Sequence, residues 1–308
     1  MELVAVVLLV GLLAGYSVLA GCDIGLGMLS PYVARTPEER RRVVSAAAPY
    51  FLGSEVWLVA AVGVTAGLFP QIEGEVVAGQ WPLFVLLLAG WLVRDAGLWL
   101  RGRVAAAAWH AVWDTAVVAG SWAVALAWGL VLAALLGGGA LPLLFTPLCV
   151  AAVALLFLLR GAAFGAERLV PVAGRTGAES AEAAARATRV LARAGLVVLP
   201  VAAAAAWLDG GVRAGAPALA VAAAVTAVLA VTAGVSGPRW SRPTSAAAMA
   251  SLPVLAAVGG QVSAAVADPR SLVLVAVATA PMVPVLAVGQ VWLYRMVRRP
   301  APESGFFA

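Results

Sequence analysis

Long apolar runs dominate the sequence, and most polar residues gather in the connections between them. A bilayer core of about 30 Å takes roughly 20 apolar residues in helical form, and nine runs are of this order of length. The runs are too long for membrane-barrel strands, and they do not alternate polar with apolar positions. We therefore expect an all-α fold: one polytopic membrane helix bundle over residues 1–308 with nine transmembrane helices. The expected spans are 3–29, 52–70, 80–100, 108–136, 143–161, 191–209, 215–236, 245–267 and 271–294.

Arginines in the connections indicate sidedness, because basic residues are in excess on the cytoplasmic side. The first, third, fifth and seventh connections and the segment after the last run hold most of them, whereas the second and fourth connections hold none. The fifth connection carries Arg160, Arg168, Arg175, Arg186 and Arg189. With an odd number of spans, this alternation predicts an N-terminus outside the cell and a cytoplasmic C-terminus. Residues 174–188 favour a short cytoplasmic helix that leads into the sixth span.

Composition agrees with a membrane protein. Hydrophobic residues make up 63% of the chain and charged residues 11%, and the mean hydropathy is +1.00. Soluble domains carry about 25% charged residues, so a soluble enzyme is excluded. The net charge is +5, and every basic residue is an arginine. Because the arginines lie mostly in short connections between apolar runs, we expect no nucleic-acid partner.

Ligands for metals and haem are scarce. His110 is the only histidine, and both cysteines, Cys22 and Cys149, lie inside apolar runs. A multi-histidine centre needs more than one imidazole, and two such cysteines give neither a disulfide framework nor a metal-ligand spacing. We expect no catalytic, metal-binding or cofactor-binding residue in this chain alone.

Six ionisable residues lie inside the first four spans, where each is costly unless it faces a partner or a cavity. They are Asp23, Glu55, Arg94, Asp95, His110 and Asp114. With the expected topology they all lie within a few turns of the cytoplasmic face and form one layer. That layer is either a proton route or contact with a partner subunit, or it is structural ion pairing in which Arg94 neutralises Asp114, Glu55 or Asp23.

His110 and Asp114 are four residues apart, so they share a helical face within hydrogen-bonding reach. The histidine is either a satisfied interfacial residue or a proton relay. Small residues in the first span allow a neighbouring helix to approach closely, and they are Gly11 with Gly15, and Gly21 with Gly25 and Gly27. The tryptophans in spans two to four are interface anchors or, alternatively, platforms for a quinone ring, and they include Trp57 and Trp113.

Three blocks of residues stand in order along the first four spans. The first block is Gly15-Tyr16 with Gly21-Cys22-Asp23-Ile24-Gly25-Leu26-Gly27-Met28-Leu29. The second block is Pro49 with Gly53-Ser54-Glu55-Val56-Trp57-Leu58, ahead of Phe69-Pro70. The third block is Trp113-Asp114 with Gly120-Ser121, preceded by Arg94, Gly97 and Arg101. Over roughly residues 10–130 these blocks resemble subunit II of the cytochrome bd-type quinol oxidases.

The resemblance implies a haem-free subunit, multi-pass in a bacterial plasma membrane, that pairs with a homologous haem-bearing subunit I. That partner would hold haem b and haem d, oxidise quinol and reduce dioxygen to water, while this chain stabilises it. The resemblance leaves open small single-span subunits and a structurally bound quinone. The family-motif residues carried over are Gly21, Gly25, Gly27, Trp57 and Trp113.

The chain departs from the family pattern at three acidic positions, which here are occupied by Ala20, Leu52 and Trp99. The resemblance implies that these acids belong to a hydrophilic proton route in some members of the family. An apolar replacement cannot pass protons, so such a route is not expected here. Protons would then arrive through subunit I, or through a path rebuilt from Asp23, Glu55 and Asp114. Two further alternatives stay open: a secondary transporter, and a scaffold subunit of a bd-like complex with an altered redox reaction.

Overall fold

The computed structural model describes residues 2–170, 178–210, 215–234, 238–259 and 269–279, and the single positions 281, 284, 285, 288, 289, 291, 292 and 295. All regular secondary structure in these ranges is helical, as the sequence predicts. The long helices are α1 (Glu2–Val33), α2 (Pro37–Leu68), α4 (Trp81–Leu100), α5 (Ala107–Leu136), α6 (Phe145–Arg168), α7 (Ala178–Leu208), α8 (Ala216–Gly234) and α9 (Pro238–Gly259). The shorter elements are α3 (Pro70–Ile72), η1 (Glu73–Ala78), η2 (Arg101–Arg103) and α10 (Pro269–Thr279).

Among the described residues, seven helices are long and apolar enough to cross a membrane: α1, α2, α4 with η2, α5, α6, α7 and α8. They correspond to the first seven expected spans. Helix α9 covers the first part of the eighth expected span, whose residues 260–267 lie outside the described ranges. Helix α10 covers the start of the ninth expected span, and most of the rest of that span also lies outside them. The count of nine spans and the orientation of the termini therefore stay predictions.

Helix ends differ from the expected spans where local capping or a continuing apolar sequence extends a helix. Helix α2 begins at Pro37, well before position 52, because Thr36 and Glu39 form a reciprocal cap. The Thr36 Oγ1 atom accepts from the Glu39 N–H at 3.2 Å, and the Glu39 carboxylate accepts from the Thr36 N–H at 2.9 Å. The assignment of Arg160 to the fifth connection is wrong, because α6 continues to Arg168. Helix α7 joins the expected connector helix and the sixth span into one helix.

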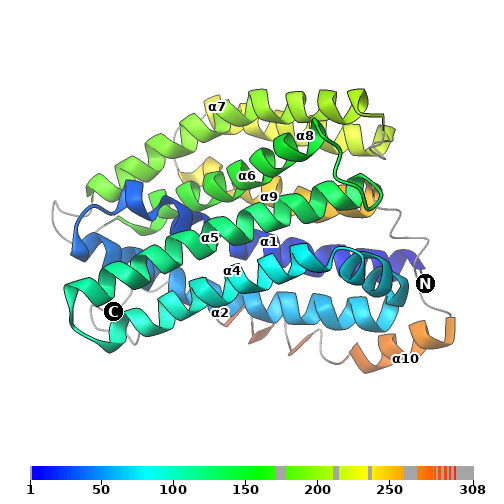
Figure 1. Ribbon diagram of the computed structural model, residues 1–308, viewed down its shortest axis with the longest axis horizontal. Helices are drawn as coiled ribbons and strands as arrows, with labels where there is room; N and C mark the ends of the chain where they lie inside the picture. Colours follow the sequence, from blue (N-terminus) through cyan, green and yellow to red (C-terminus); the bar gives the residue numbers. More distant parts are fainter. Residues whose placement is uncertain are drawn as a thin grey trace.

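Helix α1 is the centre of the bundle and packs against α2, α5, α6 and α9. Helix α4 packs along α5, and α7 packs against both α6 and α8. The long helices run in roughly one direction, with α7 and α8 on the opposite side of the bundle from α2 and α4 (Figure 1). This arrangement puts the first motif block, on α1, in contact with helices from both halves of the chain.

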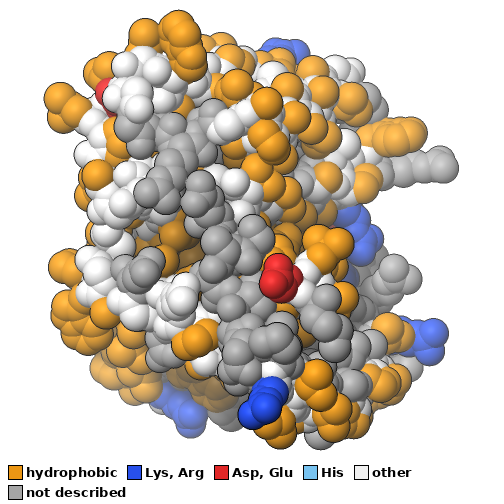
Figure 2. Space-filling view, turned by 90° about the vertical axis from the view of Figure 1, so that its right-hand side faces the viewer, with side chains coloured by type: hydrophobic (Ala, Val, Ile, Leu, Met, Phe, Trp, Pro, Cys, Tyr) orange, Lys and Arg blue, Asp and Glu red, His pale blue; other side chains and the backbone are white. Residues whose placement is uncertain are grey.

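The outward faces of these helices are apolar. Val59, Leu92, Val190 and Trp207 are each more than 60% exposed although they are large and hydrophobic. Figure 2 looks onto the end of the bundle where α1 begins, and hydrophobic side chains reach the surface there among a few charged ones. Such a surface is the expected exterior of a protein whose solvent is lipid.

The crossing of α1 and α6 depends on two glycines that face each other. A Cβ atom on Gly25 would overlap the carbonyl oxygen of Phe157, and one on Gly161 would overlap the backbone of Gly25. The obstructing atoms are backbone atoms, which cannot move aside as the end of a side chain can. The glycines therefore set how closely these helices approach, as small residues do at membrane-helix crossings.

We expect Gly25→Leu to lower the free energy of unfolding by about 1–3 kcal/mol, because overpacking of a close contact has costs of this size. Gly11→Leu is the matched control, since Gly11 lies on the same helix and a Cβ there has no neighbour within 4 Å. SDS titration monitored by circular dichroism measures both variants. Equal losses of stability in the two variants would contradict a packing role for the α1 and α6 crossing.

Candidate functional site

A buried ion pair joins the first and third expected spans. The Arg94 guanidinium on α4 pairs with the Asp23 carboxylate on α1, and each residue is only 2% exposed. The same guanidinium binds the Asp95 carboxylate at 2.9 Å and lies 5.3 Å from the centre of the Phe51 ring. The Asp23 carboxylate also accepts from the Ile24 N–H at 2.9 Å. A charge this deep is tolerated only when paired and hydrogen-bonded, and both conditions are met here.

Glu55 is a half-buried neighbour of this pair. It lies on α2, close enough for the charges of Arg94 and Asp23 to act on its carboxyl group. No hydrogen bond or ion pair engages that carboxyl within the described ranges. We call Asp23, Glu55, Arg94 and Asp95 the Arg94 cluster. It groups one guanidinium with three carboxyl groups from α1, α2 and α4.

Asp114 belongs to a separate cluster, which we call the Asp114 cluster. Its carboxylate binds the Arg101 Nε atom at 2.5 Å and lies 3.6 Å from a terminal nitrogen of Arg40. Arg101 is 4% exposed, so it is a structural cation and not a solvated loop residue. His110 is half-buried near the start of α5, and the structure gives Asp114 these two arginines as partners in place of His110. The six residues expected in one layer are therefore divided between two clusters, with His110 outside both.

The family-motif residues mark helix contacts. A Cβ atom on Gly27 would meet the Ser121 hydroxyl on α5, and one on Gly21 would lie 2.7 Å from the Arg160 Cγ atom on α6. Gly25 is at the α1 and α6 crossing described above. Trp57 packs over Gly15, and Trp113 makes an edge-to-face contact with Trp109 at 5.5 Å between ring centres. Where the structure describes the chain, the indole N–H groups of Trp57 and Trp113 are buried without a hydrogen-bond partner.

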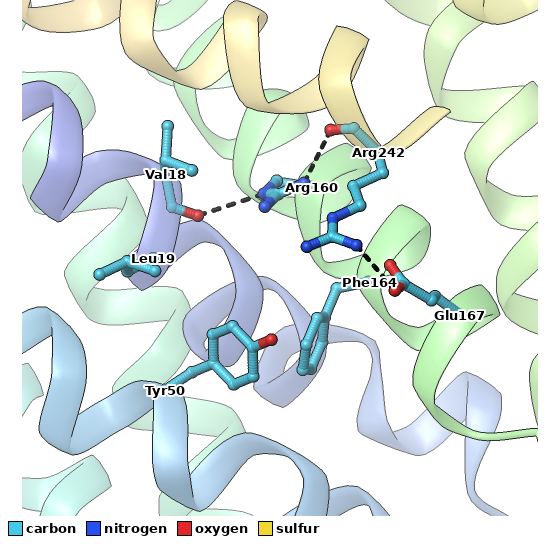
Figure 3. Close-up of a pocket in the computed structure, with 7 residues that line it drawn as sticks. All are labelled: Val18, Leu19, Tyr50, Arg160, Phe164, Glu167 and Arg242. Atoms are coloured by element: carbon cyan, nitrogen blue, oxygen red, sulfur yellow. Dashed lines mark hydrogen bonds and ion pairs between the residues drawn. The ribbon is translucent and has the colours of Figure 1, made fainter. Parts of the chain in front are cut away.

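The burial of a third guanidinium, that of Arg160, was not expected from the sequence. The residue is 7% exposed, and it donates to the carbonyl oxygen of Val18 at 3.2 Å, to that of Arg242 at 2.9 Å and to the Ser245 hydroxyl at 3.2 Å. It lines a cavity of about 300 Å³ (Figure 3). The sequence does contain an indication that Arg160 is buried. It continues as Gly161-Ala162-Ala163-Phe164 and so stays apolar for another helical turn.

The residues present do not fit a haem with two histidine ligands. His110 is the only histidine of the sequence, so a second imidazole ligand is lacking. The described part of the chain also contains no group of three or more His, Cys, Asp or Glu side chains that could hold a metal ion. Cys22 and Cys149 are buried free thiols whose sulfur atoms face the carbonyl oxygens of Val18 and Gly129. What the arrangement can do chemically is hold charge inside the bundle.

The sequence and the fold are both similar to those of known proteins. The model of the family "Cytochrome bd terminal oxidase subunit II" matches residues 1–297. Cytochrome bd-I ubiquinol oxidase subunit 2 of Escherichia coli (strain K12) is 33% identical over 132 residues, which are 42% of this chain and 35% of that protein. Cytochrome bd ubiquinol oxidase subunit 2 of Bacillus subtilis (strain 168) is 30% identical over 115 residues, 37% of this chain and 34% of that protein.

The matched segments span only about a third of these relatives. A solved structure extends the likeness of fold along the chain. The bd oxidase from Geobacillus thermodenitrificans gives a TM-score of 0.52 at 13% identity, covering 96% of this chain and 100% of the matched chain. Since the family model matches the sequence from residue 1 to residue 297, the chain belongs to the cytochrome bd terminal oxidase subunit II family.

Proposed function

We propose that this chain is the haem-free subunit II of a cytochrome bd-type terminal quinol oxidase in a bacterial plasma membrane. Its role is to stabilise a haem-bearing subunit I, which carries haem b and haem d, oxidises quinol and reduces dioxygen to water. The family match over residues 1–297 carries this proposal. The single histidine of the sequence supports the division of labour, because it leaves the haem ligands to the partner.

The proposed topology has nine spans, with the N-terminus outside and the C-terminus in the cytoplasm. In this orientation α1 ends and α2 begins on the cytoplasmic side. The basic segment Arg40-Arg41-Arg42 in the first turns of α2 then faces the cytoplasm, as the excess of arginine in this connection requires. Both the Arg94 cluster and the Asp114 cluster lie toward the same side.

We propose that both clusters are structural. Protons would then reach the active site of the complex through subunit I. Asp23 and Asp114 are each held by a buried arginine, so protonation of either would remove a charged partner from that guanidinium. The family's acidic positions are apolar here, with Ala20 buried and Leu52 and Trp99 on the exterior. A route along these helices would need groups that are free to take up and release protons.

Purification through a tag on this chain tests the proposed function. We expect a haem protein to co-purify, the complex to show haem absorbance, and oxygen uptake to depend on added quinol. A solitary folded chain without haem absorbance would contradict the proposal. Solute uptake by proteoliposomes that contain this chain alone would favour the transporter, and a haem complex without quinol-dependent oxygen uptake would favour the altered redox reaction.

Substitutions separate a structural from a proton-carrying role of the acids. We expect Glu55→Gln to leave quinol oxidase turnover and its pH profile unchanged, because Asp23 and Asp114, the other acids of the rebuilt path, are each held by a buried arginine. We expect Asp114→Asn to lower stability by about 1–3 kcal/mol, because it removes the counter-ion of buried Arg101. Turnover per assembled complex should stay near that of the unmodified protein.

Both variants are assayed after haem quantification, so that loss of assembly is not counted as loss of turnover. A shifted pH profile or a collapse of turnover in fully assembled Glu55→Gln complexes would show that the rebuilt proton path operates.

A further inference from the structure

The cavity beside Arg160 is bounded by helices from both halves of the chain. Its lining comes from α1, α2, α6 and α9, and it consists of Val18, Leu19, Tyr50, Arg160, Phe164, Glu167 and Arg242 (Figure 3). It lies toward the end of the bundle where α6 ends and α9 begins. None of these residues belongs to the Arg94 cluster or to the Asp114 cluster. A ligand in this cavity is therefore argued independently of the roles proposed for those clusters.

The charge of Arg160 has no counter-ion within the described ranges. Its hydrogen-bond partners are two carbonyl oxygens and the Ser245 hydroxyl, all of which are neutral. No carboxylate in the described part of the chain forms an ion pair with it, in contrast to Arg94, Arg101 and Arg242. An uncompensated guanidinium that is 7% exposed in an apolar bundle is unfavourable, and an anion in the adjoining cavity would relieve that cost.

The rest of the lining supports an anion with an apolar continuation. Glu167 is already paired with Arg242 at 3.0 Å, so the lining holds two guanidinium groups against one carboxylate. The Tyr50 hydroxyl accepts from Arg168 at 3.1 Å, which brings a third guanidinium close to the cavity. Val18, Leu19 and Phe164 supply apolar wall. The lining of the cavity thus combines cationic groups with apolar side chains.

We propose that this cavity binds a phosphate-bearing anion, with the Arg160 guanidinium as its principal ligand. The Nε and Nη1 atoms of Arg160 already donate to Val18, Arg242 and Ser245, which leaves the two N–H groups of Nη2 as donors to a phosphate oxygen. A charge-assisted hydrogen bond of this kind is stronger than one between neutral groups. A volume of about 300 Å³ holds a phosphate group together with several carbon atoms. Two sources share this chemistry: the headgroup of an anionic phospholipid, whose chains follow the apolar wall, and inorganic phosphate.

The test uses the complete chain, in whatever complex it purifies with, after delipidation in detergent. Phosphatidylglycerol binding is measured by native mass spectrometry, and inorganic phosphate binding by thermal shift. We expect Arg160→Gln to weaken binding of the phosphate-bearing probe about tenfold or more, because a charge-assisted hydrogen bond is lost. Arg189→Gln is the matched control, since Arg189 is exposed on α7 and the variant should bind as the unmodified chain does.

A second variant keeps the test decisive if Arg160→Gln does not fold. Val18→Phe fills the cavity from α1 while leaving Arg160 and the Val18 carbonyl oxygen in place. It should also weaken binding about tenfold or more, through loss of space. Binding of phosphatidylglycerol identifies a lipid headgroup, and binding of phosphate alone identifies the free ion. If neither probe binds, or if both cavity variants bind like Arg189→Gln, the proposal is overturned.

Discussion

The bundle depends on how it pairs charges that have been taken out of water. Asp23 and Arg94 are 71 residues apart in sequence, and each is only 2% exposed where they meet. Neither could be buried alone, since an isolated buried charge is far more costly than the net gain from any single contact. Their pairing links α4, which packs mainly along α5, directly to α1, and α1 in turn is the helix against which α2, α5, α6 and α9 pack.

Much of this could be predicted from the sequence, because a bilayer constrains membrane proteins strongly. Hydropathy predicted seven helices that the structure confirms as long and apolar enough to span a membrane. Charged residues are rare inside these helices, and this rarity drew attention to Arg94 and Asp23. The sequence offered Asp114, Glu55 or Asp23 as the partner of Arg94. Choosing among them needs the relative rotation of three helices, which no local pattern encodes.

The differences between expectation and structure have physical causes. Arginine is both a topology marker in connections and a buried cation in helices, so counting arginines misplaced Arg160, which α6 carries into the interior. Spacing allowed His110 to reach Asp114, yet Arg101 from η2 binds that carboxylate instead, because a permanently charged guanidinium is the stronger partner. Gly21, Gly25 and Gly27 make the close helix contacts that were expected, and the structure identifies α5 and α6 as the neighbours. At Gly11, where the same was expected, a Cβ atom would have no neighbour within 4 Å.

A double-mutant cycle on the Asp23 and Arg94 pair tests the central claim most directly. The free energy of unfolding is measured by SDS titration for Asp23→Asn, Arg94→Gln and the double variant. We expect each single variant to lose about 3–5 kcal/mol and the double variant to lose less than their sum, with a coupling of more than about 1 kcal/mol. The exposed pair of Glu182 and Arg186 is the control, with a coupling below about 0.5 kcal/mol. Additive losses at Asp23 and Arg94 would contradict the claim that this ion pair holds the bundle together.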